Sequence, residues 1–381
     1  MKVLFVGEYS NVYTELSSEL NSRGIETFTI SDGDAFKNYP ADFKLKNVRK
    51  QNPSIIRKIV NTCLFRLGLE GITIFLRNWT KLKSVSIGYD VVQLINPVAL
   101  SGFGSFLNLA YLKYLHKHNK KIYLSVLGDD YYTVNWFIKN DFKSDYYRSN
   151  HLKQFCKPDW AFKYKYCLGY HFLNRYAIDI SEKIIPGLRC YREPYIWTGK
   201  VTCVIPFPVN PSRLGTPLCI KKGDVINIFH GWQKGREHRK GNLIFAKVVK
   251  RLEKEYADKL QYNVVQSVPY EEYVKLYNNC HIFLDQVFFE DKGYNGLLGM
   301  AAGKVVFSGF FDKALKEYPH YYGEVIGVDV SRDEDDMYNK FRHIVETPEI
   351  INEISNNAIA FVKKNHLSSV VADMYLNVWE K

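Results

Sequence analysis

DQVFFEDKGYNGLLGMAAGK, residues 285–304, is the stretch that decides the fold prediction. A short apolar run at 281–284, typical of a buried strand, precedes the stretch, and a second apolar run begins at Lys304. Between them lie the glycine-rich segment 293–296 and a small-residue helix at 297–302. This order predicts a crossover in a parallel sheet, where the N-terminus of the helix can hold a phosphate through its free backbone N–H groups. The alternative is a glycine-rich crossover that binds no ligand.

The rest of the chain fits two α/β domains of ordinary size. It has 381 residues, of which 46% are hydrophobic and 24% charged, which is a globular composition. A strand at 2–7, a helix at 12–23 and a strand at 25–30 predict a parallel sheet at the N-terminus. The loop after that first strand faces the ligand side of such a sheet, and it consists of Glu8, Tyr9, Ser10 and Asn11.

A proline-rich segment at 204–217 is the best candidate for an interdomain linker. We therefore expect one domain over 1–205 and a second over 206–364. The remaining segment, 365–381, reads as helical.

Positive charge narrows the choice of partners. Lys and Arg number 52 against 40 Asp and Glu, a net charge of +12. The charge is dispersed and no nucleic-acid-binding motif accompanies it, so we favour an anionic small molecule and an anionic membrane surface over nucleic acid. Within the basic segment 44–83, the apolar residues Ile55, Ile56, Ile59 and Leu64 can share one helical face. Such a helix lies on an anionic bilayer or packs on its own domain, and the sequence leaves both open.

Cysteine usage and the absence of apolar spans indicate a cytoplasmic protein. The seven cysteines are an odd number without a Cys-x-x-Cys pair, which is typical of reduced thiols. No signal peptide and no run of about 20 apolar residues is present, so we expect either a free cytoplasmic protein or one peripheral to the inner face of the membrane. Asp32 and Asp34 spell an Asp-x-Asp pair, for which we favour a turn over a metal site.

The stretch 285–304 resembles the donor-sugar site of the family-four glycosyltransferases, retaining enzymes with the GT-B fold. Their motif is a Glu, seven residues, a second Glu and then Ala-Met-Ala-x-Gly-Lys. Glu290 takes the place of the first Glu, and 300–304 matches the end of the motif, but Leu298 stands where the second Glu belongs. In the family the first Glu contacts the transferred sugar and the second holds the ribose. The resemblance therefore assigns the sugar contact to Glu290 and leaves the ribose to Asn295 or to backbone groups.

Two further motifs extend the resemblance. Family-four enzymes bind the nucleotide diphosphate with an Arg and a Lys-Gly pair, which correspond here to Arg236, with Arg239 as its rival, and to Lys240-Gly241. Two cations suit a diphosphate because they neutralise the charge of the leaving group. The loop residues Gly293, Asn295 and Gly296 complete the expected phosphate site, and the base is expected near Val268 and Tyr270. The alternatives are a solvated basic loop around 236–240 and a plain turn at 268–270.

The strand at 121–127 ends at a pair of carboxylates. Many family-four relatives have a His at this place, beside the reacting sugar carbon, whereas this chain has Asp129 and Asp130. A carboxylate there, for which we choose Asp129, can act as a general base or stabilise positive charge on the sugar. The alternative is an Asp that caps the following helix.

The resemblance implies an α/β protein with the GT-B fold, that is, two Rossmann-like domains facing across a cleft. The first domain would bind the acceptor, with the loop from Glu8 to Asn11 on the acceptor side, and the second would bind the nucleotide-sugar donor. The C-terminal helix, within 365–381, would cross back and pack on the first domain. It implies a hexosyltransferase-like enzyme that needs neither a metal nor a cofactor. The enzyme would move a sugar from a nucleotide diphosphate sugar to a hydroxyl of a glycan or lipid-linked saccharide, with retention. Its place would be in bacterial surface polysaccharide synthesis. One alternative is a nucleotide-sugar epimerase of the same fold. Another is a non-catalytic relative acting as a binding or partner subunit, which Leu298 keeps open.

Overall fold

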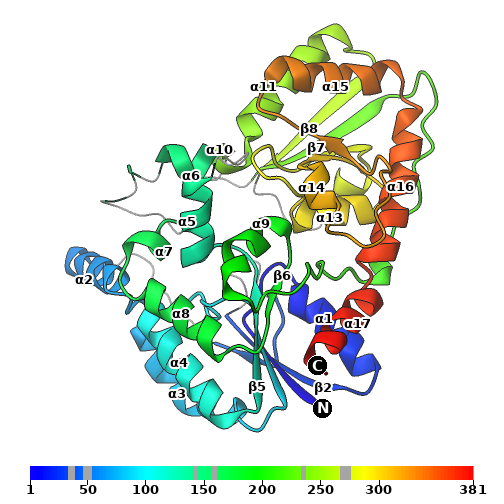
Figure 1. Cartoon of the computed structure of the whole chain (residues 1–381). Helices are drawn as coiled ribbons and strands as arrows, with labels where there is room; N and C mark the ends of the chain where they lie inside the picture. Colours follow the sequence, from blue (N-terminus) through cyan, green and yellow to red (C-terminus); the bar gives the residue numbers. More distant parts are fainter. Residues whose placement is uncertain are drawn as a thin grey trace. The chain divides into compact units, whose positions relative to one another are not determined.

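The structure is a computed structural model, and it describes residues 1–32, 39–45, 54–140, 145–150, 152–153, 155, 161–232, 237–266 and 276–380. The chain forms two compact units (Figure 1). Unit 1 comprises Met1–Asn140, Tyr147–Pro208 and Val371–Lys381, and unit 2 consists chiefly of Val209–Val370. None of the helices in the described ranges has the length and apolar character needed to cross a bilayer.

Unit 1 is built on a six-stranded parallel sheet with the order β3-β2-β1-β4-β5-β6. Both faces of its central strands are buried, which explains why these strands read as continuous apolar runs. In this doubly wound order, ligands bind beyond the carboxyl ends of the two strands where the winding reverses, here β1 and β4. The strands are β1 (Lys2–Val6), β2 (Glu26–Ser31), β3 (Phe43–Lys44), β4 (Val91–Leu94), β5 (Lys121–Val126) and β6 (Ile184–Pro186).

The helices of unit 1 connect these strands, as a parallel sheet requires. The helix predicted at 12–23 is confirmed as α1. The full set is α1 (Val12–Ser22), α2 (Ile55–Arg66), α3 (Ile72–Val85), α4 (Ser105–His118), α5 (Tyr131–Lys139), α6 (Asp145–Asn150), α7 (Lys163–Tyr166), α8 (Tyr170–Ile180), α9 (Arg189–Arg192) and the 3-10 helix η2 (Glu193–Thr198).

The C-terminal helix α17 (Ser368–Trp379) returns to unit 1, as predicted. Its last residue, Trp379, is buried and donates from Nε1 to Oε1 of Gln93 at 2.9 Å. The carbonyl of Trp379 accepts from the hydroxyl of Tyr123 at 3.2 Å, and Tyr375 lies 3.3 Å from the hydroxyl of Ser125. The helix thus completes the polar interior of unit 1 beside β4 and β5.

Unit 2 has a five-stranded parallel sheet with the order β11-β10-β9-β7-β8. Its first and third strands along the chain, β7 and β9, are neighbours, and their connections leave in opposite directions. The winding therefore reverses between β7 and β9, which places the ligand crevice of this unit beyond their carboxyl ends. The strands are β7 (Ile226–Trp232), β8 (Leu260–Gln266), β9 (Ile282–Leu284), β10 (Val305–Ser308) and β11 (Val328–Asp329).

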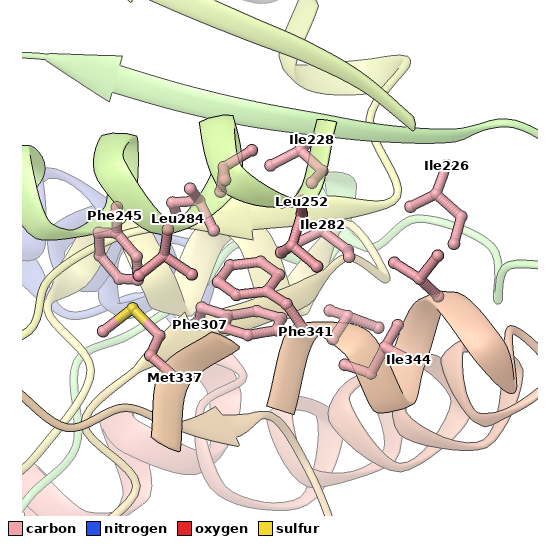
Figure 2. Close-up of a cluster of buried hydrophobic side chains, with 14 of the residues drawn as sticks. Ile226, Ile228, Phe245, Leu252, Ile282, Leu284, Phe307, Met337, Phe341 and Ile344 are labelled. Atoms are coloured by element: carbon pink, nitrogen blue, oxygen red, sulfur yellow. The ribbon is translucent and has the colours of Figure 1, made fainter. Parts of the chain in front are cut away.

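One hydrophobic core packs the sheet of unit 2 against three helices, and Figure 2 shows part of this core. Ile228, Leu284 and Phe307 are among the sheet residues of this core. Phe307 stacks on Phe341 of a covering helix, with 4.0 Å between the ring centroids. The same core sets the ends of β7 and β9, and so the position of the residues that follow them. The helices of unit 2 are α10 (Glu237–Lys240), α11 (Asn242–Glu255), α13 (Tyr294–Ala301), α14 (Asp312–Leu315), α15 (Glu334–Glu346) and α16 (Ile350–Asn365).

Candidate active site

Charged and polar residues gather at the carboxyl edge of the unit 2 sheet. Lys240 follows β7, Asp285 and Glu290 follow β9, and Ser308 ends β10. Because these three strands are adjacent and parallel, the residues that follow them share one edge of the sheet. This edge includes the reversal point between β7 and β9, where a ligand is expected.

Asp285 connects these segments, and the sequence analysis gave it no role. Its side chain is almost fully buried, and each carboxylate oxygen has partners. Oδ1 accepts from Nζ of Lys240 at 2.9 Å, and Oδ2 accepts from the hydroxyl of Ser308 at 3.0 Å and from the backbone N–H of Gly293 at 3.3 Å. A carboxylate placed directly after a buried strand was the signal in the sequence, because a charge is buried only when partners compensate it.

Lys240 is held in place at the end of the short helix α10. Its carbonyl accepts from the N–H of Val287 at 2.8 Å, and its ammonium, a quarter exposed, pairs with Asp285. Gly241 then turns the chain with a φ of 74° into α11. A Cβ at Gly241 would lie 2.7 Å from the Cβ of Val287, so this Lys-Gly pair needs its glycine for both conformation and space.

The helix that follows the glycine segment begins earlier than predicted. Helix α13 starts at Tyr294, with Gly293 as its N-cap, so the prediction of a loop over 293–296 and a helix from 297 was wrong. Asn295 and Gly296 belong to the first helical turn. A Cβ at Gly296 would lie 2.8 Å from Oδ2 of Asp285, so the glycine makes room for the buried carboxylate under this turn. Close packing there outweighs the low helix propensity of glycine.

Glu290 lies beside this turn and is 4% exposed. Its carbonyl accepts from the N–H of Phe311 at 3.0 Å, and Gly309 passes so close that a Cβ there would lie 2.5 Å from the carbonyl carbon of Glu290. The next residues, Asp291 and Lys292, form a buried ion pair of 3.1 Å that also contacts the hydroxyl of Tyr318. These contacts fix the backbone that carries Glu290 between β9 and α13.

His230 joins the neighbouring elements beneath Lys240. Its Nδ1 lies 2.6 Å from the hydroxyl of Tyr262 on β8, and its Nε2 lies 2.8 Å from the amide of Asn242 on α11. Burial, and secondarily the charge of Lys240, lowers the pKa of His230 to about 3. The ring is therefore neutral, and it ties β7 to β8 and α11 without adding charge to the site.

In unit 1 the two carboxylates after β5 have separate partners. Asp129 is buried and its Oδ1 accepts from the hydroxyl of Tyr147 at 2.6 Å. Asp130 is the N-cap of α5 and accepts from the backbone N–H of Thr133 at 2.9 Å and from its hydroxyl at 3.0 Å. Burial raises the pKa of Asp130 to about 6. The helix-capping alternative thus describes Asp130, and Asp129 remains the candidate for chemistry.

The predicted acceptor-side loop, Glu8 to Asn11, lies at the carboxyl end of β1. Glu8 is fully buried and accepts from the backbone N–H of Thr14 at 2.9 Å and from its hydroxyl at 3.0 Å, so it supports the first turn of α1. The hydroxyl of Tyr9 donates to the carbonyl of Val98 at 3.3 Å. Ser10 and Asn11 both have positive φ values, which gives the loop a tight turn before α1.

Solved structures similar to the chain are consistent with these two units. A sucrose-phosphate synthase from Thermosynechococcus elongatus matches with a TM-score of 0.61 and 14% identity, covering 100% of this chain and 98% of the other. HepE from Anabaena, in complex with UDP and glucose, matches with a TM-score of 0.57 and 11% identity over 100% and 99%. A UDP-GlcNAc 2-epimerase from Neisseria meningitidis, bound to UDP-GlcNAc, matches with a TM-score of 0.52 and 12% identity over 100% of both chains. The chain has the GT-B fold.

The fold prediction is therefore confirmed, while identities this low establish the fold alone. No family model and no curated protein sequence matches the chain. Within the GT-B fold, Lys240, Glu290 and the first turn of α13 all belong to the C-terminal Rossmann-like unit. The roles predicted for them remain predictions.

Several predicted site residues lie outside the described part of the chain: Arg236, Val268, Tyr270 and Asp34. The rival of Arg236, Arg239, is described, and its guanidinium lies 5.7 Å from the centre of the Phe289 ring, next to Glu290. Asp32 accepts from the hydroxyl of Ser101 at 2.6 Å and from the N–H of Gly102 at 2.7 Å. No cluster of three or more potential metal ligands occurs among the residues that the structure describes.

Proposed function

We propose that the chain is a glycosyltransferase that moves a sugar from a nucleotide diphosphate sugar to a hydroxyl of a glycan or lipid-linked saccharide, in bacterial surface polysaccharide synthesis and with retention. The observation that carries the proposal is the edge of the unit 2 sheet. There the cation Lys240 comes from the β7 side, the buried Glu290 comes from the β9 side, and helix α13 begins between β9 and β10. A cation and a helix N-terminus suit a diphosphate, and a carboxylate suits sugar hydroxyls.

The proposed chemistry follows from these charges. The bond between the anomeric carbon and the diphosphate oxygen breaks, and its electron pair leaves with the diphosphate. Lys240 and the N–H groups of the first turn of α13 then stabilise the added negative charge. The acceptor oxygen forms the new bond to the anomeric carbon and releases its proton. Glu290 would hold the hydroxyls of the donor sugar, and Asp129 would stabilise positive charge on the sugar or accept that proton.

Uridine nucleotides are the first donors to test, because HepE was solved with UDP and with UDP-glucose. The experiment is a thermal-shift panel that begins with UDP, UDP-glucose and UDP-GlcNAc and extends to sugar diphosphates of the other nucleosides. A ligand at 100 times its Kd stabilises the native state by about 2.7 kcal/mol. We expect a shift with one donor, a smaller shift in Lys240→Ala, and an unchanged shift in Lys221→Ala, which removes an exposed lysine of the same unit. Absence of a shift with every sugar nucleotide contradicts the proposal.

Turnover separates transfer from binding. With the donor from the panel, a glycosyltransferase releases the nucleotide in proportion to added acceptor, and Glu290→Gln should lose turnover while it still folds. A non-catalytic relative should tolerate Glu290→Gln in every assay. Leu298, half-buried on α13, keeps this possibility relevant.

A nucleotide-sugar epimerase is the second candidate, and similarity to the Neisseria epimerase structure bound to UDP-GlcNAc favours testing it. An epimerase converts the donor without any acceptor, and NMR of the sugar anomeric protons detects the new epimer. Conversion without acceptor would replace the proposal of transfer, whereas strict dependence on acceptor would support it.

A further inference from the structure

Helix α2 buries none of its twelve residues, all of which the structure describes. Four large apolar side chains in its first half are exposed: Ile55 and Ile56 at 76%, Ile59 at 59% and Val60 at 48%. Helices in globular proteins gain most of their stability by packing an apolar face, and a helix this short is marginal without it. These four residues therefore lack the packing that the apolar face of a helix in a globular unit normally has, although Leu64 and Phe65 at the other end of α2 are partly buried.

The exposed residues form one face. Positions i, i+1, i+4 and i+5 lie on the same side of a helix, which places the four apolar residues together. Cys63, also exposed, continues this face one turn further. Arg57 and Lys58 fall on the other side of the helix, and the helix has no acidic residue. The sequence left open whether the face of Ile55, Ile56, Ile59 and Leu64 packs on its own domain. In the structure the three isoleucines are exposed, whereas Leu64, near the end of the helix, is partly buried.

The helix is nevertheless a built element with a fixed end. Ser54 caps its N-terminus by accepting from the N–H of Arg57. At the other end, the carbonyl of Arg66 accepts from the N–H of Leu168 at 2.9 Å, and the carbonyl of Gly68 accepts from the N–H of Phe106 at 3.1 Å. Unit 1 thus holds the C-terminal end of α2, and the helix projects from the edge of the unit (Figure 1).

Charge identifies the kind of partner. Residues 44–83 contain ten basic residues and one acidic residue, Glu70. Glu70 pairs with Lys163 at 2.8 Å and accepts from the hydroxyl of Tyr170 at 3.0 Å, so its charge is already compensated. A second copy of this chain would bring the same positive charge against this face. An anionic partner with an apolar layer beneath its charges fits both features.

We propose that α2 docks the protein on an anionic lipid bilayer. The face of Ile55, Ile56, Ile59 and Val60 enters the boundary between headgroups and acyl chains, and Arg57 and Lys58 reach back to the lipid phosphates. This surface is independent of the donor site, so its test needs neither donor nor acceptor.

The test is flotation of the full chain with two kinds of vesicle, phosphatidylcholine alone and phosphatidylcholine mixed with phosphatidylglycerol. We expect binding to the anionic vesicles only. Arg57→Gln/Lys58→Gln should weaken binding about 30-fold, and Ile56→Ser/Ile59→Ser at least about tenfold. Lys221→Gln/Lys222→Gln, which removes two exposed lysines of unit 2, should bind like the wild type. No binding of the wild type, or equal loss in the unit 2 variant, overturns the proposal.

Cys63 offers a second readout. An environment-sensitive fluorophore on Cys63, in a variant in which Cys156, Cys203 and Cys219 are replaced by Ser, should shift to the blue with anionic vesicles. Binding without a blue shift would show that another surface contacts the lipid, and would overturn the assignment to α2. The altered residues of α2 are exposed, so thermal unfolding of each α2 variant should match the wild type.

Discussion

Replacing Asp285 tests whether the candidate site depends on a buried carboxylate. Both of its oxygens are in use, one for Lys240 and the other for Ser308 and the N–H of Gly293. An asparagine has a single acceptor oxygen, so Asp285→Asn must turn an NH2 group toward one of these donors. An alanine leaves all three donors without their acceptor.

The contacts set the size of the effect. Hydrogen bonds to charged groups contribute about 1.5–3 kcal/mol, and an unsatisfied buried donor costs about 1–3 kcal/mol. Lys240 is a quarter exposed and can turn to water, which limits the cost of Asp285→Asn to about 2 kcal/mol. Asp285→Ala also leaves the hydroxyl of Ser308 and the N–H of Gly293 without this acceptor, which raises the loss in free energy of unfolding to about 4 kcal/mol.

Scanning calorimetry measures the outcome. For a unit of this size, 1 kcal/mol shifts the Tm by about 2–4 °C, so we expect a decrease of about 4–8 °C for Asp285→Asn and about twice that for Asp285→Ala. The control is Asp312→Asn, an exposed carboxylate of the same unit that pairs with Lys316, and its Tm should not change. If Asp285→Asn melts like the control, Asp285 does not hold the site together and our reasoning fails.

Three further predictions concern the pH dependence of stability and the conformation of the chain. Burial lowers the pKa of His230 from 6.5 to about 3, so as the pH falls this imidazole takes up a proton in the unfolded chain before it does so in the folded one. Unit 2 should therefore lose up to about 1.4 kcal/mol of stability per pH unit as the pH falls below 6.5. Asp130 acts in the opposite sense in unit 1, because burial raises its pKa from 3.8 to about 6. The stability that Asp130 contributes at low pH is lost as the pH rises through 6. In urea unfolding, the free energy of unfolding should depend less on pH in His230→Gln for unit 2 and in Asp130→Asn for unit 1. Gly241→Ala should destabilise unit 2 by about 2 kcal/mol, whereas Gly323→Ala, with positive φ but open space around it, should cost less in the same assay.

Much of the fold could be predicted from the sequence because the strands are buried on both faces. Continuous apolar runs such as 3–6 and 282–284 mark central strands of parallel sheets, and Gly7 marks the turn after the first of them. The position of Lys240 before a helix could likewise be predicted, since the family that the chain resembles has a Lys-Gly pair there.

The network around the site could not be predicted in the same way. The burial of Asp285 depends on the hydroxyl of Ser308, which is far from it in sequence, and on the backbone N–H of Gly293. Neither residue type by itself indicates a contact with a carboxylate. The early start of α13 depends on Gly296 making room for that carboxylate, whereas local propensity favours a loop there. Such partners follow from three-dimensional packing, which single-residue patterns do not encode.

The return of α17 to unit 1 has a consequence for the order in which the protein matures. Gln93, Tyr123 and Ser125 each have one hydrogen-bond partner on α17, either Tyr375 or Trp379, and the ribosome adds these two residues only after all of unit 2. Synthesis of unit 1 therefore begins before that of unit 2 but ends after it. Unit 2 can fold while unit 1 still lacks its last helix. A stop codon just before Val371 would leave unit 2 whole and the interior of unit 1 open to water and to chaperones.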